Sequence, residues 1–433
     1  MKKQLFRAIL ICSVIVCGIL LCASCNNNQG GNEPLIPMKP EFLSESDISY
    51  TCQDGSVLST YNGKTEADFE AVDDYYKALG YETYSESVKN GSRFSTLVNG
   101  ENMTHIYYLE DRGELNVVTS DTAGATLPPK TPAAVGGEYE VTVTQMKDPA
   151  HVNGMGYVIR LADGSFIVYD GSYADRASKL MQYLKILAGD EKIVIRAWVI
   201  THSHNDHYPA FHQFAEKYNN RVKLEYVIVS PIDPEVAVAT GGDTYFNEEL
   251  ASDIARFKGA KTVYAHTGMN FTFCNLNMEI LLSPDDLFKN AGHMNNFNNS
   301  SIVSRLYDED YSFLLTADIG SAGSEWMTSV YGDYLQSDMC QVSHHGVEDV
   351  PLNFYEVVKA PILFYPCNQY LYDLDSRFND VRAALREKEY TKEILIAGLE
   401  RFTRVWGASF EDDEPLSMPG YVPPTVEELN TTN

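Results

Sequence analysis

The chain has 433 residues, of which 44% are hydrophobic and 21% are charged. That length exceeds one ordinary domain, and the composition is typical of a chain with a packed core rather than of a disordered one. Lysine and arginine number 33 against 60 acidic residues, which gives a net charge of −27. A protein that coats nucleic acid non-specifically needs a basic surface, so this class is excluded.

The N-terminus has the features of a removable leader. Lys2, Lys3 and Arg7 precede an uninterrupted, mostly apolar run over residues 8–21. The run has the length of a signal-peptide core and is too short to span a bilayer. We therefore predict a signal peptide over residues 1–25, whose removal would take the net charge from −27 to −30.

The end of this leader resembles the lipoprotein box of bacteria, because the small residues Ala23 and Ser24 precede Cys25. The resemblance implies that Cys25 becomes the lipid-bearing first residue and holds the protein on a membrane surface, outside the cytoplasm, in the cell envelope. One departure is Cys22, where the family usually has leucine. A plain secretory signal cut nearby is the alternative. Residues 26–46, rich in Asn, Gly, Pro and Glu, are predicted to be a tether.

The cysteines outside the leader are Cys52, Cys274, Cys340 and Cys367. They are widely spaced and include no CxxC pair, so the sequence predicts neither a disulfide framework nor a zinc ribbon. One bridge is compatible with an oxidising compartment, but the spacing favours buried thiols.

A small α+β module is predicted over residues 47–122. Apolar residues recur on one face of a helix over 66–79, and Thr65 with Asp68 three residues later forms a capping box. Alternating apolar residues predict strands at 94–98, 104–109 and 115–119. The module carries no catalytic constellation, so we interpret it as a unit for packing or for binding a protein partner.

The larger part of the chain is predicted to be α/β. A linker rich in proline spans residues 123–137, and strands then alternate with helices over 138–410. The clearest elements are a hairpin of strands 157–160 and 166–169, a helix over 174–187, a buried strand over 193–200 and a helix over 211–218. The tail, 411–433, has six acids and no bases and is predicted to be extended.

A metal-binding pattern follows the buried strand. Residues 201–207 read Thr-His-Ser-His-Asn-Asp-His. His202 and His204 are two apart and point the same way in extended backbone, while Asp206 and His207 turn into the next helix and reach a second ion. Such nitrogen and oxygen ligands suit Zn²⁺, and also Mn²⁺ or Fe²⁺. A polar loop with fortuitous histidines is the alternative, and the density of ligands argues against it.

The HxHxDH motif at a strand end is the signature of the metallo-β-lactamase-like superfamily, which the chain resembles over residues 138–410. The resemblance implies an αβ/βα sandwich of two sheets with outer helices. It also implies that Asp170, at the end of an apolar strand, braces the site. Asp318, at the end of another such strand, would bridge two metals, and His344 would be the last metal histidine.

Within the superfamily, the chain resembles most closely the metallo-hydrolase domain of the DNA-uptake competence proteins (ComEC type). The segments that carry this likeness are Asn-Asn-Ser-Ser-Ile-Val at 298–303, Thr-Ala-Asp at 316–318 and Ser-His-His-Gly at 343–346. Glu325 also fits the pattern. The chain departs from it at residues 209–210, which are Pro-Ala instead of Gly-Gly, and at Val347, which replaces a serine and weakens the transfer of phosphate binding. It has no counterpart of the subgroup's membrane channel.

One ligand of the superfamily has no evident counterpart. Members with two full sites use a further histidine before the bridging aspartate, where this chain has Asn298 and Asn299. An amide oxygen is a weak ligand. His266 and His293 lie in the same interval, and we interpret both as structural or solvated. Two metals are still expected, with unequal affinities.

The favoured hypothesis divides the ligands between two ions, one on His202 and His204, the other on Asp206, His207 and His344, with Asp318 between them. A metal-activated water would attack a carbonyl or phosphorus, and the second ion or His345 would stabilise the charge on the substrate oxygen. Asp206, His345 and Asp170 are thus the expected catalytic residues. The subgroup resemblance favours a phosphodiester or another small ester as the substrate. A lactonase or β-lactamase is the first alternative, and a surface binding protein that holds metals without turnover is the second.

Overall fold

The computed structural model describes residues 38–130, 138–147, 153–242, 245–289, 296–347, 350–374, 379–408 and 415–423. The predicted signal peptide with Cys25, most of the tether, His293 and parts of the linker and tail lie outside these ranges. Residues from 37 onward form one compact unit. None of the described helices is long and apolar enough to cross a membrane. The four cysteines of this unit are free and buried, as predicted.

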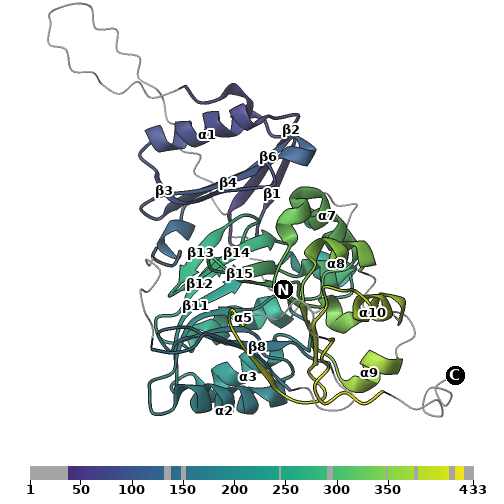
Figure 1. Cartoon of the computed structure of the whole chain (residues 1–433). Helices are drawn as coiled ribbons and strands as arrows, with labels where there is room; N and C mark the ends of the chain where they lie inside the picture. Colours follow the sequence, from purple (N-terminus) through teal and green to yellow (C-terminus); the bar gives the residue numbers. More distant parts are fainter. Residues whose placement is uncertain are drawn as a thin grey trace, which may run out of the picture. The chain divides into compact units, whose positions relative to one another are not determined.

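An antiparallel sheet with one helix forms the N-terminal part (Figure 1). Its strand order is β1-β2-β6-β5-β4-β3, from β1 (Ile48–Thr51), β2 (Val57–Asn62), β3 (Glu82–Lys89), β4 (Ser92–Asn99), β5 (Asn102–Leu109) and β6 (Glu114–Ser120). Helix α1 (Glu66–Ala78) begins at Thr65, and the predicted capping box with Asp68 is present. The first three strands are additional to those predicted, because polar residues interrupt their apolar alternation.

Two further sheets pack face to face. The second sheet has the order β12-β11-β10-β9-β8-β7-β20, from β7 (Thr142–Gln145), β8 (Gly156–Arg160), β9 (Phe166–Asp170), β10 (Val194–Val199), β11 (Lys223–Val229), β12 (Lys261–Tyr264) and β20 (Phe402–Val405). The third sheet follows chain order, from β13 (Asn270–Phe273), β14 (Leu276–Leu282), β15 (Val303–Tyr307), β16 (Ser312–Leu315), β17 (Met339–Gln341), β18 (Ile362–Tyr365) to β19 (Glu393–Ile396). The predicted hairpin is the antiparallel pair β8–β9.

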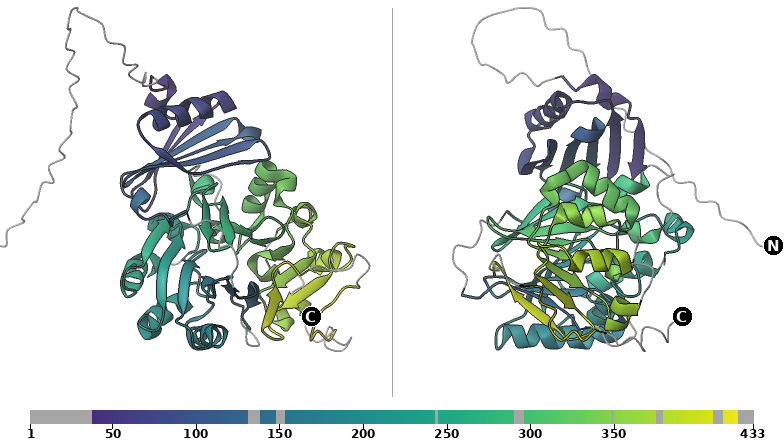
Figure 2. Two further views of the ribbon diagram at one scale, coloured as in Figure 1. Left: turned by 60° about the vertical axis from the view of Figure 1, so that its left-hand side comes forward. Right: turned by 45° about the vertical axis from the view of Figure 1, so that its right-hand side comes forward.

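Helices cover the outer faces of this pair of sheets (Figure 2). Those beside the second sheet are α2 (Ala177–Ala188), α3 (Pro209–Tyr218), α4 (Pro234–Ala239) and α5 (Tyr245–Ala255), and those beside or after the third are α6 (Asp285–Phe288), α7 (Ser321–Tyr331), α8 (Leu352–Val358), α9 (Gln369–Leu374) and α10 (Asn379–Arg386). Between the sheets, Tyr157 meets Phe313 and Phe364 edge to face, with ring centroids 5.6 and 5.9 Å apart. The αβ/βα sandwich expected from the sequence is therefore confirmed.

Buried polar contacts attach the N-terminal sheet to the third sheet and to α6. The Lys289 ammonium lies 2.6 Å from Glu114 Oε1 on β6 and 2.9 Å from Asp286 Oδ1 on α6. Lys89 on β3 pairs with Glu279 on β14 at 3.0 Å, and both side chains are buried. Buried charges are costly unless they are paired, so these contacts select one docking geometry.

His105 on β5 makes a third contact of this kind, and it predicts a pH-dependent stability. Its Nε2–H donates to the carbonyl of Thr267 at 2.8 Å, and its Nδ1 lies 2.9 Å from Thr96 Oγ1. Burial lowers the pKa of His105 to about 3. The unfolded chain takes up this proton near pH 6.5. The histidine therefore adds stability above pH 6.5, and this stability is lost as the pH falls from 6.5 towards 3, by up to about 1.4 kcal/mol per pH unit.

We expect His105→Gln to flatten the acid dependence of stability within that window, although the variant is less stable at pH 7. Urea unfolding of both proteins at a series of pH values measures the difference. If the free energy of unfolding of the two proteins falls in parallel between pH 4 and 6.5, His105 is not the group that causes the acid dependence of stability.

Candidate metal centre

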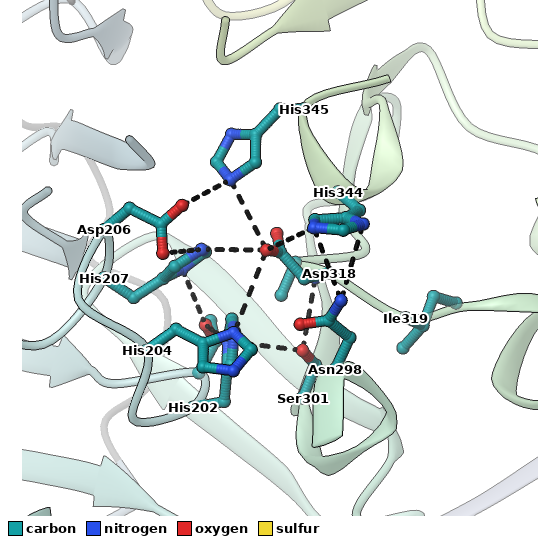
Figure 3. Close-up of polar contacts among 12 residues, drawn as sticks. His202, His204, Asp206, His207, Asn298, Ser301, Asp318, Ile319, His344 and His345 are labelled. Carbon is teal, nitrogen blue, oxygen red and sulfur yellow. Dashed lines mark hydrogen bonds and ion pairs between the residues drawn. The ribbon is translucent and has the colours of Figure 1, made fainter. Parts of the chain in front are cut away.

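The centre lies at the carboxyl ends of parallel strands from the two packed sheets (Figure 3). In the second sheet, Asp170 is the last residue of β9, and the histidine-rich loop follows its parallel neighbour β10. In the third sheet, Asp318 follows β16, and His344 and His345 follow its parallel neighbour β17. Carboxyl ends of adjacent parallel strands share one edge of a sheet, so residues far apart in the sequence meet there.

Backbone hydrogen bonds shape the histidine-rich loop. The N–H of His207 donates to the carbonyl of His204 at 3.0 Å, which closes a turn directly after the extended part. The N–H of Met155 donates to the carbonyl of Asp206, also at 3.0 Å. Helix α3 then starts at Pro209, whose fixed φ suits the first helical position. The turn separates the donors into two groups.

One donor group contains Asp206, His207, Asp318 and His345, whose ligand atoms all lie within 4.8 Å of one another. His207 Nε2 is 3.1 Å from Asp318 Oδ2. His345 Nε2 is 3.1 Å from Asp206 Oδ2 and 3.4 Å from Asp318 Oδ2. Two imidazoles and two carboxylates therefore converge on one position.

The other donor group contains His202, His204 and Asp318, again with ligand atoms within 4.8 Å of one another. His202 Nε2 lies 3.1 Å from His204 Nδ1 and 3.8 Å from Asp318 Oδ2. Asp318 belongs to both groups. This arrangement suits two ions that share one carboxylate.

Both neighbouring histidines of the HHG segment lie within 4 Å of Asp318 Oδ2, but they occupy different positions in the centre. His345 stands in the group with Asp206, where the sequence placed His344. His344 lies with its Nε2 3.9 Å from Asp318 Oδ2 and 3.3 Å from Asn298 Nδ2, and 24% of its side chain is exposed. Both histidines have a positive φ, 43° and 58°, so the backbone turns sharply and sends the adjacent rings in different directions.

Asp170 supports the centre through its hydrogen bonds to Thr201 and His207. It has a φ of 49° and is fully buried. Its carboxylate accepts hydrogen bonds from the Thr201 N–H at 2.8 Å, the Thr201 hydroxyl at 2.7 Å and His207 Nδ1–H at 2.7 Å. His207 is therefore fixed with Nε2 facing Asp318. Asp170 acts as a positioning residue, which is the brace that the resemblance implied.

The electrostatics divide the imidazoles into two kinds. Burial lowers the pKa of His202 far below its ordinary value and lowers that of His204, so both are neutral and able to act as ligands. Burial also opposes the charge on His345, but the charge of Asp318 and a hydrogen bond to Asp206 raise its pKa to about 10. The donor group around Asp206 is thus an ion-paired network whose protons a metal would displace.

The residues present fit a divalent metal. Asp318 Oδ1 is buried and has no hydrogen-bond partner among the described residues, although burying such an atom unpaired is costly. The donors are imidazole nitrogens and carboxylate oxygens, which suit Zn²⁺ and also Mn²⁺ or Fe²⁺. Ser301 was not assigned a role from the sequence, yet its hydroxyl accepts from the Asp318 N–H at 3.2 Å. In the sequence, only the position of Ser301 in the Asn-Asn-Ser-Ser segment indicated that it could lie at the centre.

The placement of the two histidines predicts different effects of their removal. The loss of a residue that only supports a ligand weakens metal binding by about 10–100-fold. We expect His345→Ala to weaken the binding of one ion by more than this, because the substitution removes a ligand itself. We expect His344→Ala, the matched substitution one residue earlier, to have the smaller effect. Titration with Zn²⁺ against a chelator of known affinity measures both. A larger loss in His344→Ala would contradict the placement seen here.

The comparison with protein-family models agrees with this fold. Residues 151–361 match the model of the metallo-beta-lactamase superfamily, whose members include metal-dependent hydrolases. The matched residues include the whole of the candidate metal centre, from Asp170 to His345. No curated protein sequence is significantly similar to the chain. The comparisons do not test the closer resemblance to the competence proteins, which stays a prediction.

The solved structures that resemble this chain are distant from it in sequence. The metallo-beta-lactamase fold protein YhfI from Bacillus subtilis is 13% identical over 61% of this chain and 99% of that chain, with a TM-score of 0.40. Human tRNase Z, short form, is 12% identical over 52% of this chain and 90% of the tRNase Z chain, with a TM-score of 0.31. CmlA, a diiron β-hydroxylase from Streptomyces venezuelae, is 14% identical over 62% of this chain and 45% of its own, with a TM-score of 0.31.

Proposed function

We propose that the protein is a metal-dependent hydrolase with a binuclear centre. The observation that carries the proposal is the sharing of Asp318 by two donor groups. His202 and His204 would hold one ion, and Asp206, His207 and His345 would hold the other. Zn²⁺ is the first choice, with Mn²⁺ or Fe²⁺ as alternatives.

The ions and the residues of the chain would have different roles in the reaction. Two ions bound there would supply Lewis acidity and an activated water nucleophile. The chain keeps His202 and His204 neutral by burial, and Asp170 holds His207 in one orientation. The buried carbonyl of Pro366 accepts from His345 Nδ1–H at 2.6 Å, which leaves Nε2 of that ring facing the carboxylates.

The substrate that we propose is a phosphodiester or another small ester. Support comes from the sequence resemblance to the hydrolase domain of the competence proteins. We also propose that a lipid on Cys25 holds the enzyme on the membrane surface of the cell envelope, and that the N-terminal sheet region binds a protein partner or serves for packing. Membrane fractionation of Cys25→Ser against the parent protein tests the anchor, because only the parent should sediment with membranes.

Metal counting followed by a substrate screen tests the proposed activity. We expect elemental analysis to find about two more ions per chain in the purified protein than in Asp318→Asn, and we expect hydrolysis within a panel of phosphodiesters, lactones and β-lactams. Asp206→Ala should abolish turnover, whereas Asp175→Ala, the same change at an exposed residue, should not. Ions without turnover on any panel member would favour the silent binding protein, and unchanged activity in Asp206→Ala would refute the assignment of the centre.

A further inference from the structure

A second cluster of metal-ligating side chains lies outside the centre described above. Cys52, His266 and Asp285 bring one sulfur, one nitrogen and one oxygen within 4.8 Å of one another. The three residues are buried, with exposed fractions of 7%, 2% and 3%. They share no member with the donor groups around Asp318.

Each of the three residues comes from a connection next to a different sheet. Cys52 begins the tight turn between β1 and β2, where its N–H donates to the carbonyl of Ser56 at 2.9 Å. His266 follows β12, the edge strand of the second sheet, and its carbonyl accepts from the N–H of Met269 at 3.1 Å. Asp285 follows β14 of the third sheet and opens α6. The cluster is therefore a point where all three sheets meet.

The hydrogen bonding of His266 is incomplete. Its Nδ1 lies 3.0 Å from Asp285 Oδ2, so one ring nitrogen is satisfied by the carboxylate. Its Nε2 is buried and has no hydrogen-bond partner among the described residues. A buried polar atom without a partner costs about 1–3 kcal/mol, so such atoms call for a specific explanation.

The chemistry of the cluster points to a metal rather than to a catalytic thiol. Cysteine, histidine and aspartate are the side chains that bind Zn²⁺, and a structural zinc is enclosed by its ligands. A cysteine nucleophile must reach a substrate, whereas Cys52 is buried, with 7% of the residue exposed.

We propose that Cys52, His266 and Asp285 bind a structural Zn²⁺ ion, separate from the catalytic centre, that ties the three sheets together. Structural zinc takes four protein ligands, so one further group of the chain would complete the set. Such an ion binds only the folded chain, and its loss would destabilise the docking of the N-terminal sheet.

Cobalt substitution tests this site independently of the proposed activity. The donor groups around Asp318 contain only nitrogen and oxygen ligands, so Co²⁺ bound there gives no absorption from charge transfer between thiolate and cobalt. We expect the Co²⁺-loaded wild-type protein to show this near-ultraviolet absorption. Cys52→Ser should lose it together with one ion per chain, and Cys274→Ser, a matched change at another buried thiol, should keep it. Asp318→Asn, which disrupts the other centre, should keep it as well.

Cysteine alkylation in mild urea provides a second measurement that needs no variant. Peptide mass spectrometry should show that Zn²⁺ slows the alkylation of Cys52 and leaves that of Cys274 unchanged. Absence of the absorption in cobalt-loaded wild-type protein, or its persistence in Cys52→Ser, would overturn the proposal. If Cys52→Ser does not fold, equal alkylation of Cys52 with and without Zn²⁺ would overturn it.

Discussion

Asp318→Asn is expected to remove tight metal binding from both donor groups and to lower hydrolytic kcat/KM by about a thousandfold or more, which corresponds to about 4 kcal/mol of transition-state stabilisation. The reason is that Asp318 is the one side chain common to both groups. The amide is neutral and a weak ligand, and it leaves the charges of His207 and His345 without their central partner. Elemental analysis and steady-state kinetics on the substrate found in the screen measure the two effects.

The matched control for this substitution is Asp310→Asn, at an exposed residue of the loop between β15 and β16. It should retain the metal content and activity of the parent protein. Circular dichroism establishes that both variants are folded. An ion count in folded Asp318→Asn equal to that of the parent protein would show that the two groups do not depend on a shared carboxylate.

Lys289→Met is expected to destabilise the protein by about 3–5 kcal/mol, because it leaves buried acids without their cation. The Lys289 ammonium contacts Glu114, Asp286 and the Asn116 side-chain oxygen at 2.6, 2.9 and 2.8 Å, and 2% of the lysine side chain is exposed. Since these partners lie on β6 and α6, the loss should fall on the attachment of the N-terminal sheet. Urea unfolding measures the free energy, and hydrogen exchange of β6 locates the change.

Lys223→Met provides the comparison on an exposed ion pair. Lys223 pairs with Glu225, and 53% of the lysine side chain is exposed, so its removal should cost no more than about 1 kcal/mol. Equal losses in the two variants would mean that the buried network around Lys289 does not stabilise the docked sheet beyond an ordinary surface pair.

Local patterns in the sequence were sufficient for strands β8, β9 and β10 of the second sheet. The strand that precedes the histidine-rich loop is a continuous apolar run, and its structural bounds, Val194–Val199, lie within the predicted 193–200. Helix α1 was predictable for a similar reason, because its cap is formed by residues three apart. Strands β1 and β3 were not predictable, because they are short or polar edge strands whose pairing depends on a distant neighbour.

In the candidate centre, too, some features could be predicted from neighbouring residues and others depended on the tertiary structure. The spacing of His202, His204, Asp206 and His207 is a property of six consecutive residues, so the sequence could assign them to metal binding. The choice between His344 and His345 depends on two positive φ angles in the turn after β17. No residue pattern specifies which of two adjacent rings such a turn directs at Asp318.

The sequence by itself determined the kinds of ligand, the order of the motifs and the α/β class, because each depends on neighbouring residues or on hydrophobic periodicity. Only the tertiary structure decided that Asp318 belongs to both donor groups and that Cys52 and Asp285 surround His266, which the sequence indicated to be structural or solvated. The physical reason is that these contacts join different strands and connections, and some of them span long stretches of the sequence, such as the 111 residues between His207 and Asp318. They arise from the order of strands in three sheets, which no local pattern encodes.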